Sequence, residues 1–216
     1  MSSSNCKAED LLLYAVTDRS WLKGRTLKEV VKESLDGGVT FLQIREKDLD
    51  EADFIKEAKE IQALCKEYKV PFIINDNVDI TYSLDADGVH VGQSDMEAGD
   101  VRRKLGPDKI IGVSARTVEQ ALLAEKNGAD YLGVGAAFPT GTKSDAKAVT
   151  FETIKAICEA VSIPVVAIGG ISSSNLMKLK GTGVNGVAVV SAIYAADDIK
   201  AATENLRNLT EEMVKG

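Results

Sequence analysis

Short apolar runs alternate with longer amphipathic stretches along almost the whole chain. The short runs favour β-strands, whereas the longer stretches repeat their apolar residues every three or four positions, as a helix with one buried face does. Strands are predicted at residues 11–16, 39–44, 71–75, 88–91, 109–114, 131–135, 164–170 and 186–190. The clearest helical patterns span residues 26–37, 50–69, 117–128 and 150–161. This alternation predicts the α/β class.

The predicted strands are almost continuously apolar, which is typical of parallel strands covered by helices. At four joints a small residue follows a helix and a strand begins at once, and glycine there can adopt the left-handed conformation that ends a helix. These joints lie at residues 36–44, 85–91, 127–134 and 182–189. The pattern therefore indicates compact strand–helix units with short connections.

The number of units favours a closed barrel over an open sheet. Eight predicted strands occupy 216 residues, and no linker rich in Pro, Gly or Ser interrupts them. A doubly wound sheet is the alternative, but it usually carries GxGxxG after its first strand, where this chain reads YAVTDRSW. We expect a single-domain (β/α)8 TIM barrel over residues 1–216, with residues 1–10 as a poorly ordered or short N-terminal extension.

Charge and cysteine content narrow the class of partner. The chain carries 33 acidic and 26 basic residues, a net charge of -7, which opposes a general attraction to nucleic acid or anionic membranes. The first apolar run, Leu11 to Val16, is too short for a signal-peptide core, and no membrane span is indicated. The three cysteines lie far apart, which indicates free thiols in a reducing compartment. We expect a cytoplasmic protein that acts on small molecules, and the oligomeric state stays open.

Polar residues follow nearly every predicted strand, where a barrel of this type places its active site. Each alone is compatible with an ordinary loop, but their recurrence at equivalent strand ends is hard to explain by solvation. They are Gln43, Arg45, Glu46, Lys47, Asn75, Asp76, Gln93, Asp95, Ser114, Arg116, Thr140, Thr142, Lys143, Gly169, Gly170 and Ser191. The sequence therefore predicts one shared polar mouth at the carboxyl ends of the strands.

A magnesium site is predicted from two carboxylates in this mouth. Asp76 and Asp95 follow adjacent strands, and Mg²⁺ commonly uses one or two protein carboxylates together with water and substrate phosphate oxygens. Either aspartate alone could be a helix N-cap. Arg45, Lys47 and Lys143 add positive charge that can hold a diphosphate and stabilise it as it leaves. For Glu46, in contrast, we expect an ordinary solvated position.

Two glycines and a helix start provide a second anion site. AIGGI (167–171) and VVSAI (189–193) offer backbone N–H groups after two successive strands, an arrangement used for phosphate at this end of barrels. The only histidine, His90, lies inside a strand and is expected to be a hydrogen-bonded core residue. Neither a Ser-His-acid triad nor a zinc cluster is indicated. The mouth thus suits activation of a leaving group better than covalent catalysis.

Seven short motifs together resemble the thiamine phosphate synthase family. They are QIREK (43–47), IND (74–76), HVGQSD (90–95), GVSA (112–115), FPTGTK (138–143), AIGG (167–170) and VVSAI (189–193). The resemblance runs in order over nearly the whole chain, and the combination of motifs is specific although each one is short. One position departs from the usual family pattern, because Arg116 follows GVSA where a histidine is common.

The resemblance implies a transferase reaction in which hydroxymethylpyrimidine diphosphate loses diphosphate and its methylene carbon is captured by the nitrogen of a thiazole phosphate. It implies that the pyrimidine diphosphate is held by Gln43, Ile44, Arg45, Glu46, Lys47, Asn75, Ser114 and Lys143, among which Arg45, Lys47, Ser114 and Lys143 are catalytic. It implies that the thiazole phosphate is held by Thr140, Gly141, Thr142, Gly170, Val190 and Ser191. The Mg²⁺ cofactor would be bound by Asp76 and Asp95.

Two other functions fit the same barrel. A thiazole tautomerase shares much of the sequence pattern, but such relatives lack the magnesium carboxylate pair and the Asn-Asp step. Asp76, Asp95 and Lys143 are all present here, which favours a synthase. A non-catalytic barrel that binds a phosphorylated metabolite is the second alternative. Turnover in a simple mixing assay would decide between this alternative and a synthase.

Overall fold

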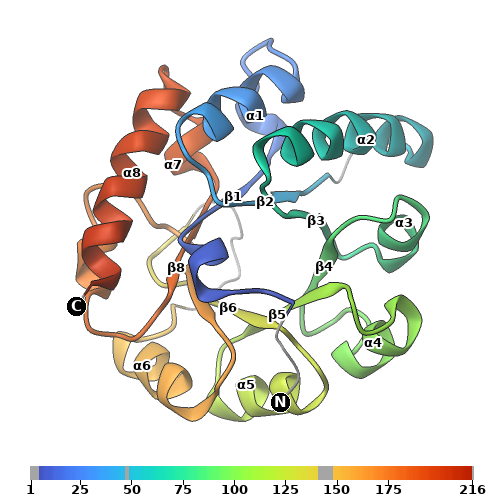
Figure 1. Ribbon diagram of the computed structural model, residues 1–216. Coiled ribbons are helices and arrows are strands. Elements are labelled where there is room, and N and C mark those ends of the chain that lie inside the picture. The colour runs from blue at the N-terminus through green and yellow to red at the C-terminus, as the bar shows by residue number, and fades with distance from the viewer. Residues whose placement is uncertain (1–4, 47–48, 141–147, 216) are drawn as a thin grey trace.

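The computed structural model describes residues 5–46, 49–140 and 148–215. Eight parallel strands close into a barrel in sequence order, and the last strand pairs with the first. Figure 1 shows the strands around the barrel axis with the helices outside them. The predicted (β/α)8 barrel is confirmed.

The strands are short and lie within the apolar runs of the sequence. They are β1 (Leu13–Val16), β2 (Phe41–Ile44), β3 (Phe72–Asn75), β4 (Gly88–Val91), β5 (Ile110–Ala115), β6 (Tyr131–Gly135), β7 (Val165–Ile168) and β8 (Gly186–Val189). The α-helices are α1 (Leu27–Asp36), α2 (Glu51–Tyr68), α3 (Val78–Ser83), α4 (Ala98–Leu105), α5 (Val118–Lys126), α6 (Phe151–Ala160), α7 (Ser191–Tyr194) and α8 (Ile199–Val214). Short 3-10 helices η1 (Ala8–Leu11), η2 (Arg19–Trp21) and η3 (Leu176–Leu179) complete the described elements. No helix in the described ranges is long and apolar enough to cross a membrane.

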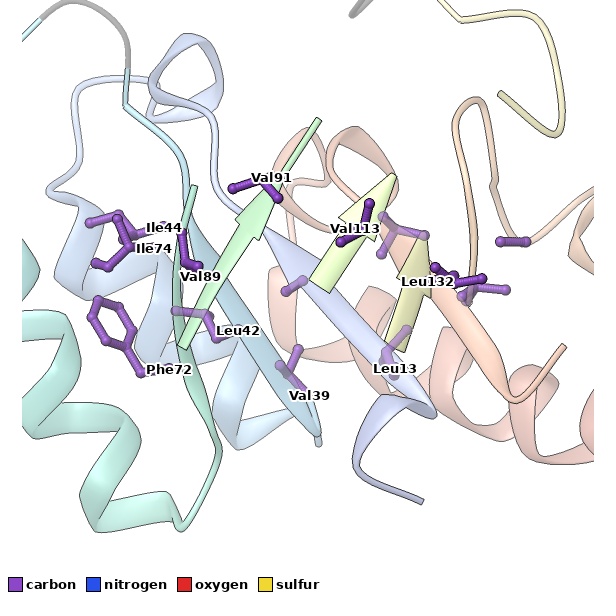
Figure 2. Packing of buried hydrophobic residues seen from close by; sticks show 14 of the residues in the cluster. Leu13, Val39, Leu42, Ile44, Phe72, Ile74, Val89, Val91, Val113 and Leu132 are labelled. Atoms are coloured by element: carbon purple, nitrogen blue, oxygen red, sulfur yellow. The ribbon is translucent and has the colours of Figure 1, made fainter. Parts of the chain in front are cut away.

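Alternate residues of each strand face the barrel interior and the surrounding helices. The outward-facing residues form a large apolar layer with the helices, part of which is drawn in Figure 2. The inward-facing residues form a smaller cluster that includes Phe41 and Ile73. Because side chains alternate along a strand, the next inward positions after these two are Gln43 and Asn75. Predicted site residues therefore continue the barrel interior upward into the mouth.

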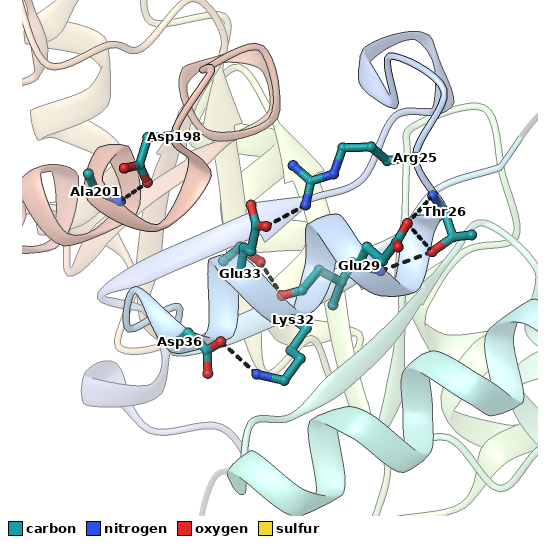
Figure 3. Close-up of polar contacts among 10 residues, drawn as sticks. Arg25, Thr26, Glu29, Lys32, Glu33, Asp36, Asp198 and Ala201 are labelled. Carbon is teal, nitrogen blue, oxygen red and sulfur yellow. Dashed lines mark hydrogen bonds and ion pairs between the residues drawn. The ribbon is translucent and has the colours of Figure 1, made fainter.

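Side-chain caps mark the starts of α1, α2, α3, α5, α6 and α8, as Figure 3 shows for α1 and α8. Thr26 and Glu29 form a reciprocal capping box at the start of α1, with hydrogen bonds of 2.8 and 3.2 Å. Asp198 accepts a 2.9 Å hydrogen bond from the backbone N–H of Ala201 at the start of α8. Such caps satisfy N–H groups that have no partner within the helix. They mark where these helices start after the preceding loops.

Residues 5–11 close the end of the barrel opposite the mouth. Cys6 and Leu11 are buried in the interior cluster, and Leu11 O lies 2.0 Å from where a Cβ on Gly186 would be. Asn5 donates a 2.6 Å hydrogen bond to Pro107 O. Part of the predicted N-terminal extension therefore plugs the barrel, while residues 1–4 lie outside the described residues.

Gly112 leaves the space that the ring of Tyr131 fills. A Cβ on Gly112 would lie 2.1 Å from Cζ of Tyr131, inside the close-packed interior of the barrel. We expect Gly112→Ala to lower the free energy of unfolding by about 1–3 kcal/mol, the usual cost of overpacking a core, measured by urea denaturation. Gly99→Ala on α4 is the control, because its nearest contacts would be 3.9 Å away. Equal stability of the two variants would contradict this account of Gly112.

Candidate active site

Arg45 is fixed at the mouth between the loops that follow β1 and β2. Its backbone N–H donates a 3.0 Å hydrogen bond to Thr17 Oγ1, and its guanidinium lies 3.6 Å from a carboxylate oxygen of Asp18. The side chains of Arg45 and Asp18 are only 13% and 16% exposed. Because this pair is partly shielded from water, Asp18 restrains the guanidinium of Arg45 more than it would restrain an exposed arginine side chain.

Glu46 does not occupy the solvated position expected from the sequence. Its side chain is only 6% exposed and lies 2.6 Å from Arg19, which comes from η2 after β1 and also contacts Glu57 on α2. Burial raises the pKa of Glu57, and Arg19 opposes that rise. The expectation for Glu46 is wrong because Arg19, 27 residues earlier in the chain, folds across it. Glu46 therefore ties the first two loops of the mouth together.

Asp76 follows β3 in an unusual backbone conformation. Its φ is +60°, in the left-handed region that aspartate tolerates better than most residues. Its backbone N–H donates a 2.8 Å hydrogen bond to His90 O on β4, and Asn75 Nδ2 donates a 2.6 Å hydrogen bond to its carboxylate. The solvent-exposed carboxylate of Asp76 is thereby directed at the end of β3 beside β4.

The loop after β4 lies between the ends of β3 and β5. Asp95 accepts a 2.6 Å hydrogen bond from Gly92 N–H, which folds this loop back on the end of β4. Gln93 Nε2 donates a 2.7 Å hydrogen bond to Ser114 O on β5. Together with the bond from Asp76 to His90, these contacts join three successive strand ends into one rim. Asp95 is exposed to solvent at this rim.

The described start of the loop after β6 runs beside the loop after β7 in the other half of the mouth. Phe138 N–H donates a 3.0 Å hydrogen bond to Gly169 O, and a Cβ on Gly170 would lie only 2.4 Å from Pro139 O. Gly170 has a φ of +66°, so both its conformation and its surroundings favour glycine. Asn175 holds Gly170 O with a 2.8 Å hydrogen bond. Thr140 directly follows Pro139, so its backbone begins close to Gly170.

Val190 and Ser191 begin α7 directly after β8. Strand β8 pairs with β7, and Ile168 lies opposite Ala188, so the chain after β8 leaves the barrel beside Gly169. The structure thus brings together the two strand ends from which a phosphate site was predicted.

A continuous hydrogen-bonded chain of side chains crosses the barrel interior below the mouth. Gln43 Nε2 donates to the hydroxyl of Tyr14, which lies 2.8 Å from that of Tyr131. His90 Nδ1 lies 3.0 Å from the Tyr131 hydroxyl, and its Nε2 lies 2.9 Å from Ser114 Oγ. His90 is 9% exposed, which agrees with the prediction of a hydrogen-bonded core histidine.

The two tyrosines of this hydrogen-bonded series are not identified as part of the site from the sequence alone. Tyr14 and Tyr131 lie within apolar strand runs and look like ordinary core residues there. The useful signal is their position on the inward-facing side of a strand. In nearly continuous apolar runs this side cannot be identified, because the outward face is apolar too.

Other predicted site residues have different placements. Ile44 is fully buried in the outer layer, so only its backbone can face the mouth. Arg116 is exposed, and its backbone N–H donates a 2.8 Å hydrogen bond to Gln120. The predicted residues Lys47, Gly141, Thr142 and Lys143 lie outside the described residues. A cavity of about 190 Å³ lies beside the mouth and is lined in part by Glu46 and Asn75.

Comparison with known proteins assigns the family. A family model described as thiamine monophosphate synthase matches residues 13–193. The chain belongs to the thiamine monophosphate synthase family. It is 50% identical over 203 residues to a thiamine-phosphate synthase of Clostridium tetani, with 94% of this chain and 97% of the relative covered. A thiamine-phosphate synthase of Ruminiclostridium cellulolyticum is 52% identical over 91% of this chain and 94% of the relative.

A solved structure of the same family has the same fold over almost its full length. The thiamine phosphate pyrophosphorylase from Pyrococcus furiosus is 42% identical, with a TM-score of 0.88 over 96% of this chain and 98% of that one. A 3-hexulose-6-phosphate synthase at 18% identity and a TM-score of 0.64 shows only the shared barrel. Membership of the thiamine monophosphate synthase family makes this chain an enzyme, a transferase, as predicted.

Proposed function

We propose that this enzyme joins hydroxymethylpyrimidine diphosphate to a thiazole phosphate, forming thiamine phosphate and releasing diphosphate. The observation that carries the proposal is the joined rim at β3, β4 and β5, where Asn75, Asp76, Asp95 and Ser114 lie at neighbouring strand ends. In the reaction, the bond between the methylene carbon and the diphosphate oxygen breaks with its electrons on oxygen. The thiazole nitrogen then forms the new bond to carbon.

Asp76 and Asp95 fit the ligand chemistry of Mg²⁺. Both are solvent-exposed carboxylates, and each follows one of two adjacent strands. Within the described part of the chain, no group of three or more His, Cys, Asp or Glu side chains is placed to hold a metal. A cation here would therefore complete its shell with water and phosphate oxygens, as Mg²⁺ commonly does. Bound there, Mg²⁺ would neutralise charge on the diphosphate.

Arg45 supplies a described positive charge for binding the diphosphate. Its shielded pair with Asp18 keeps the guanidinium at the mouth, and a guanidinium can hold two phosphate oxygens at once. We assign Lys47 and Lys143 to the same role from their motifs. Asn75 and Ser114, which end the inward faces of β3 and β5, would contact the pyrimidine diphosphate from inside the barrel.

The thiazole phosphate is assigned to the loops after β6, β7 and β8. Gly170 is held close to Pro139, which places the start of the Thr140 loop beside the backbone after β7. Val190 and Ser191 add the backbone after β8. Backbone N–H groups at this end of a barrel are well suited to phosphate. The two substrates would thus approach from opposite parts of one mouth.

The test is to mix both substrates with the purified chain, with and without Mg²⁺, and to measure thiamine phosphate and diphosphate. We expect equal amounts of both products and little turnover without Mg²⁺. Isomerisation of a thiazole phosphate without coupling would favour the tautomerase alternative. Binding without any turnover would favour the non-catalytic alternative, and either result would contradict the proposal.

Thr140→Val tests how the mouth is divided between the substrates. Loss of a hydroxyl that binds a charged phosphate should raise the KM for thiazole phosphate by about 10- to 100-fold. The KM for pyrimidine diphosphate should change little, and steady-state kinetics with each substrate varied in turn measures both. Thr153→Val on α6 is the control, because Thr153 hydrogen-bonds only to Thr150 among the side chains of the described residues. A rise confined to the pyrimidine diphosphate would reverse the assignment.

A further inference from the structure

The buried hydrogen-bonded chain below the mouth ends at Ser114, which the proposed function places against the pyrimidine diphosphate. Its other end is Gln43, to which the family resemblance assigns the same substrate. Its inner members come from three different strands and are almost inaccessible to solvent: Tyr14 is 1% exposed, Tyr131 0% and His90 9%. The barrel makes room for them, because a Cβ on Gly133 would lie 3.1 Å from His90 Cε1. Polar groups at this depth are costly unless hydrogen-bonded.

The direction of the hydrogen bonds follows from the protons that must be accommodated. Gln43 Nε2 donates to Tyr14, so the buried proton of Tyr14 needs another acceptor, and the Tyr131 hydroxyl lies 2.8 Å away. Tyr131 in turn must donate to His90 Nδ1. Burial raises the pKa of both tyrosines well above their usual range, so both phenols keep their protons.

The opposite direction leaves a buried proton without an acceptor. If Tyr131 donated to Tyr14, the proton of Tyr14 would face the amide N–H of Gln43. A buried donor without an acceptor costs more than an average hydrogen bond contributes. The described residues contain no buried side-chain N or O atom that lacks a partner. In this series of hydrogen bonds, each donor therefore points from Gln43 toward His90.

We infer that Tyr14, Tyr131 and His90 are positioning residues that hold Ser114 as a hydrogen-bond donor toward the mouth. With Nδ1 accepting from Tyr131, the neutral imidazole carries its proton on Nε2 and donates it to Ser114 Oγ. The Ser114 proton is then directed away from the histidine. The inference rests on the proposed function and deepens it: Ser114 offers its proton to an acceptor atom of the substrate, either a pyrimidine ring nitrogen or a diphosphate oxygen.

The histidine can be observed directly, because it is the only one in the chain. Nitrogen NMR of the imidazole in protein without a histidine tag distinguishes the two neutral tautomers and the cation. We expect the single tautomer with the proton on Nε2. The other tautomer, or an imidazole protonated on both nitrogens, would overturn the inference whether or not the enzyme makes thiamine phosphate.

Variants test the direction of the chain without activity measurements. Tyr131→Phe keeps the ring and removes the hydroxyl that donates to His90 Nδ1, so it should give a mixture of tautomers. Tyr14→Phe should leave the tautomer unchanged, because His90 Nδ1 is then the remaining hydrogen-bond acceptor for the Tyr131 hydroxyl. Ser114→Ala should leave the tautomer unchanged, because the determining donor lies on the other side of the histidine. Tyr194→Phe is the matched control, since Tyr194 is similarly buried but its hydroxyl is hydrogen-bonded to Ser34, which is not part of the series from Gln43 to Ser114. An unchanged spectrum in Tyr131→Phe would contradict the inference.

Kinetics then connect the chain to the proposed site. Tyr131→Phe should lower kcat/KM for the pyrimidine diphosphate by about threefold to tenfold, with the KM for thiazole phosphate unchanged. In a Ser114→Ala background the same change should have no further effect, because Tyr131 acts through Ser114. Additive effects would refute the positioning role. A Ser114→Ala variant with full activity would instead refute the proposed contact between Ser114 and the substrate, while the NMR result would stand.

Discussion

Asp76→Asn should reduce kcat by at least about 100-fold and raise the Mg²⁺ concentration needed for half-maximal activity by about 10- to 100-fold. The substitution removes a charge with little change in shape. Asparagine tolerates the left-handed backbone at φ +60° as aspartate does, and its side-chain oxygen can still accept the hydrogen bond from Asn75. A loss of activity therefore reports on the carboxylate charge. Steady-state rates across a Mg²⁺ titration provide the measurement.

Asp79→Asn is the matched control for this prediction. Asp79 lies on α3, only three residues after Asp76, and its side chain is 82% exposed and paired with Lys104. It should keep nearly normal rates and the normal Mg²⁺ requirement. If Asp76→Asn behaved in the same way as this control, the assignment of Asp76 to the metal would have to be abandoned.

The barrel could be predicted because its strands and helices are each marked locally in the sequence. The capping box of Thr26 and Glu29 can be identified from the chain itself, and so can the apolar run Phe41–Ile44. The common rim could also be predicted from the sequence, because the carboxyl ends of the parallel strands in a closed barrel all lie on the same side. This is why the sequence alone predicts that Asp76 and Ser114 belong to one mouth.

What could not be predicted depends on contacts between distant segments. The burial of Glu46 depends on Arg19, and the role of His90 depends on Tyr131, which lies 41 residues further along the chain. Neither pair leaves a local pattern. Sequence also cannot show which tyrosines face inward when both faces of a strand are apolar. The resemblance to a family supplied the site residues at the rim but no account of the chain beneath them.

The joint at residues 85–91 shows how local glycine signals can mislead. We expected a glycine to take the left-handed conformation there, but Asp85 does so with a φ of +50°. Gly88 instead lies within β4, where a Cβ would come within 2.0 Å of Ile110 O. The glycine is required by close packing of two strands and not by the turn. A glycine before a strand gives the same sequence pattern whether a left-handed turn or close strand packing requires it.

Arg45→Gln should lower kcat by about 100- to 1000-fold, with a smaller rise in the KM for pyrimidine diphosphate. The reason is that negative charge accumulates on the leaving diphosphate as the bond to carbon breaks, so a fixed positive charge stabilises the transition state more than the bound substrate. The guanidinium is only 13% exposed, which limits its screening by water. Steady-state kinetics at saturating Mg²⁺ separates kcat from KM.

Two controls distinguish this role from general electrostatics and from structure. Arg103→Gln removes the same charge from an exposed position on α4, where the arginine pairs with Asp100, and should change kcat little. Urea denaturation of Arg45→Gln should show a folded protein, because the backbone bond from residue 45 to Thr17 does not depend on the side chain. If only the KM for pyrimidine diphosphate rose, Arg45 would bind the diphosphate in the ground state without assisting its departure, and the charge that drives the reaction would have to come from other groups.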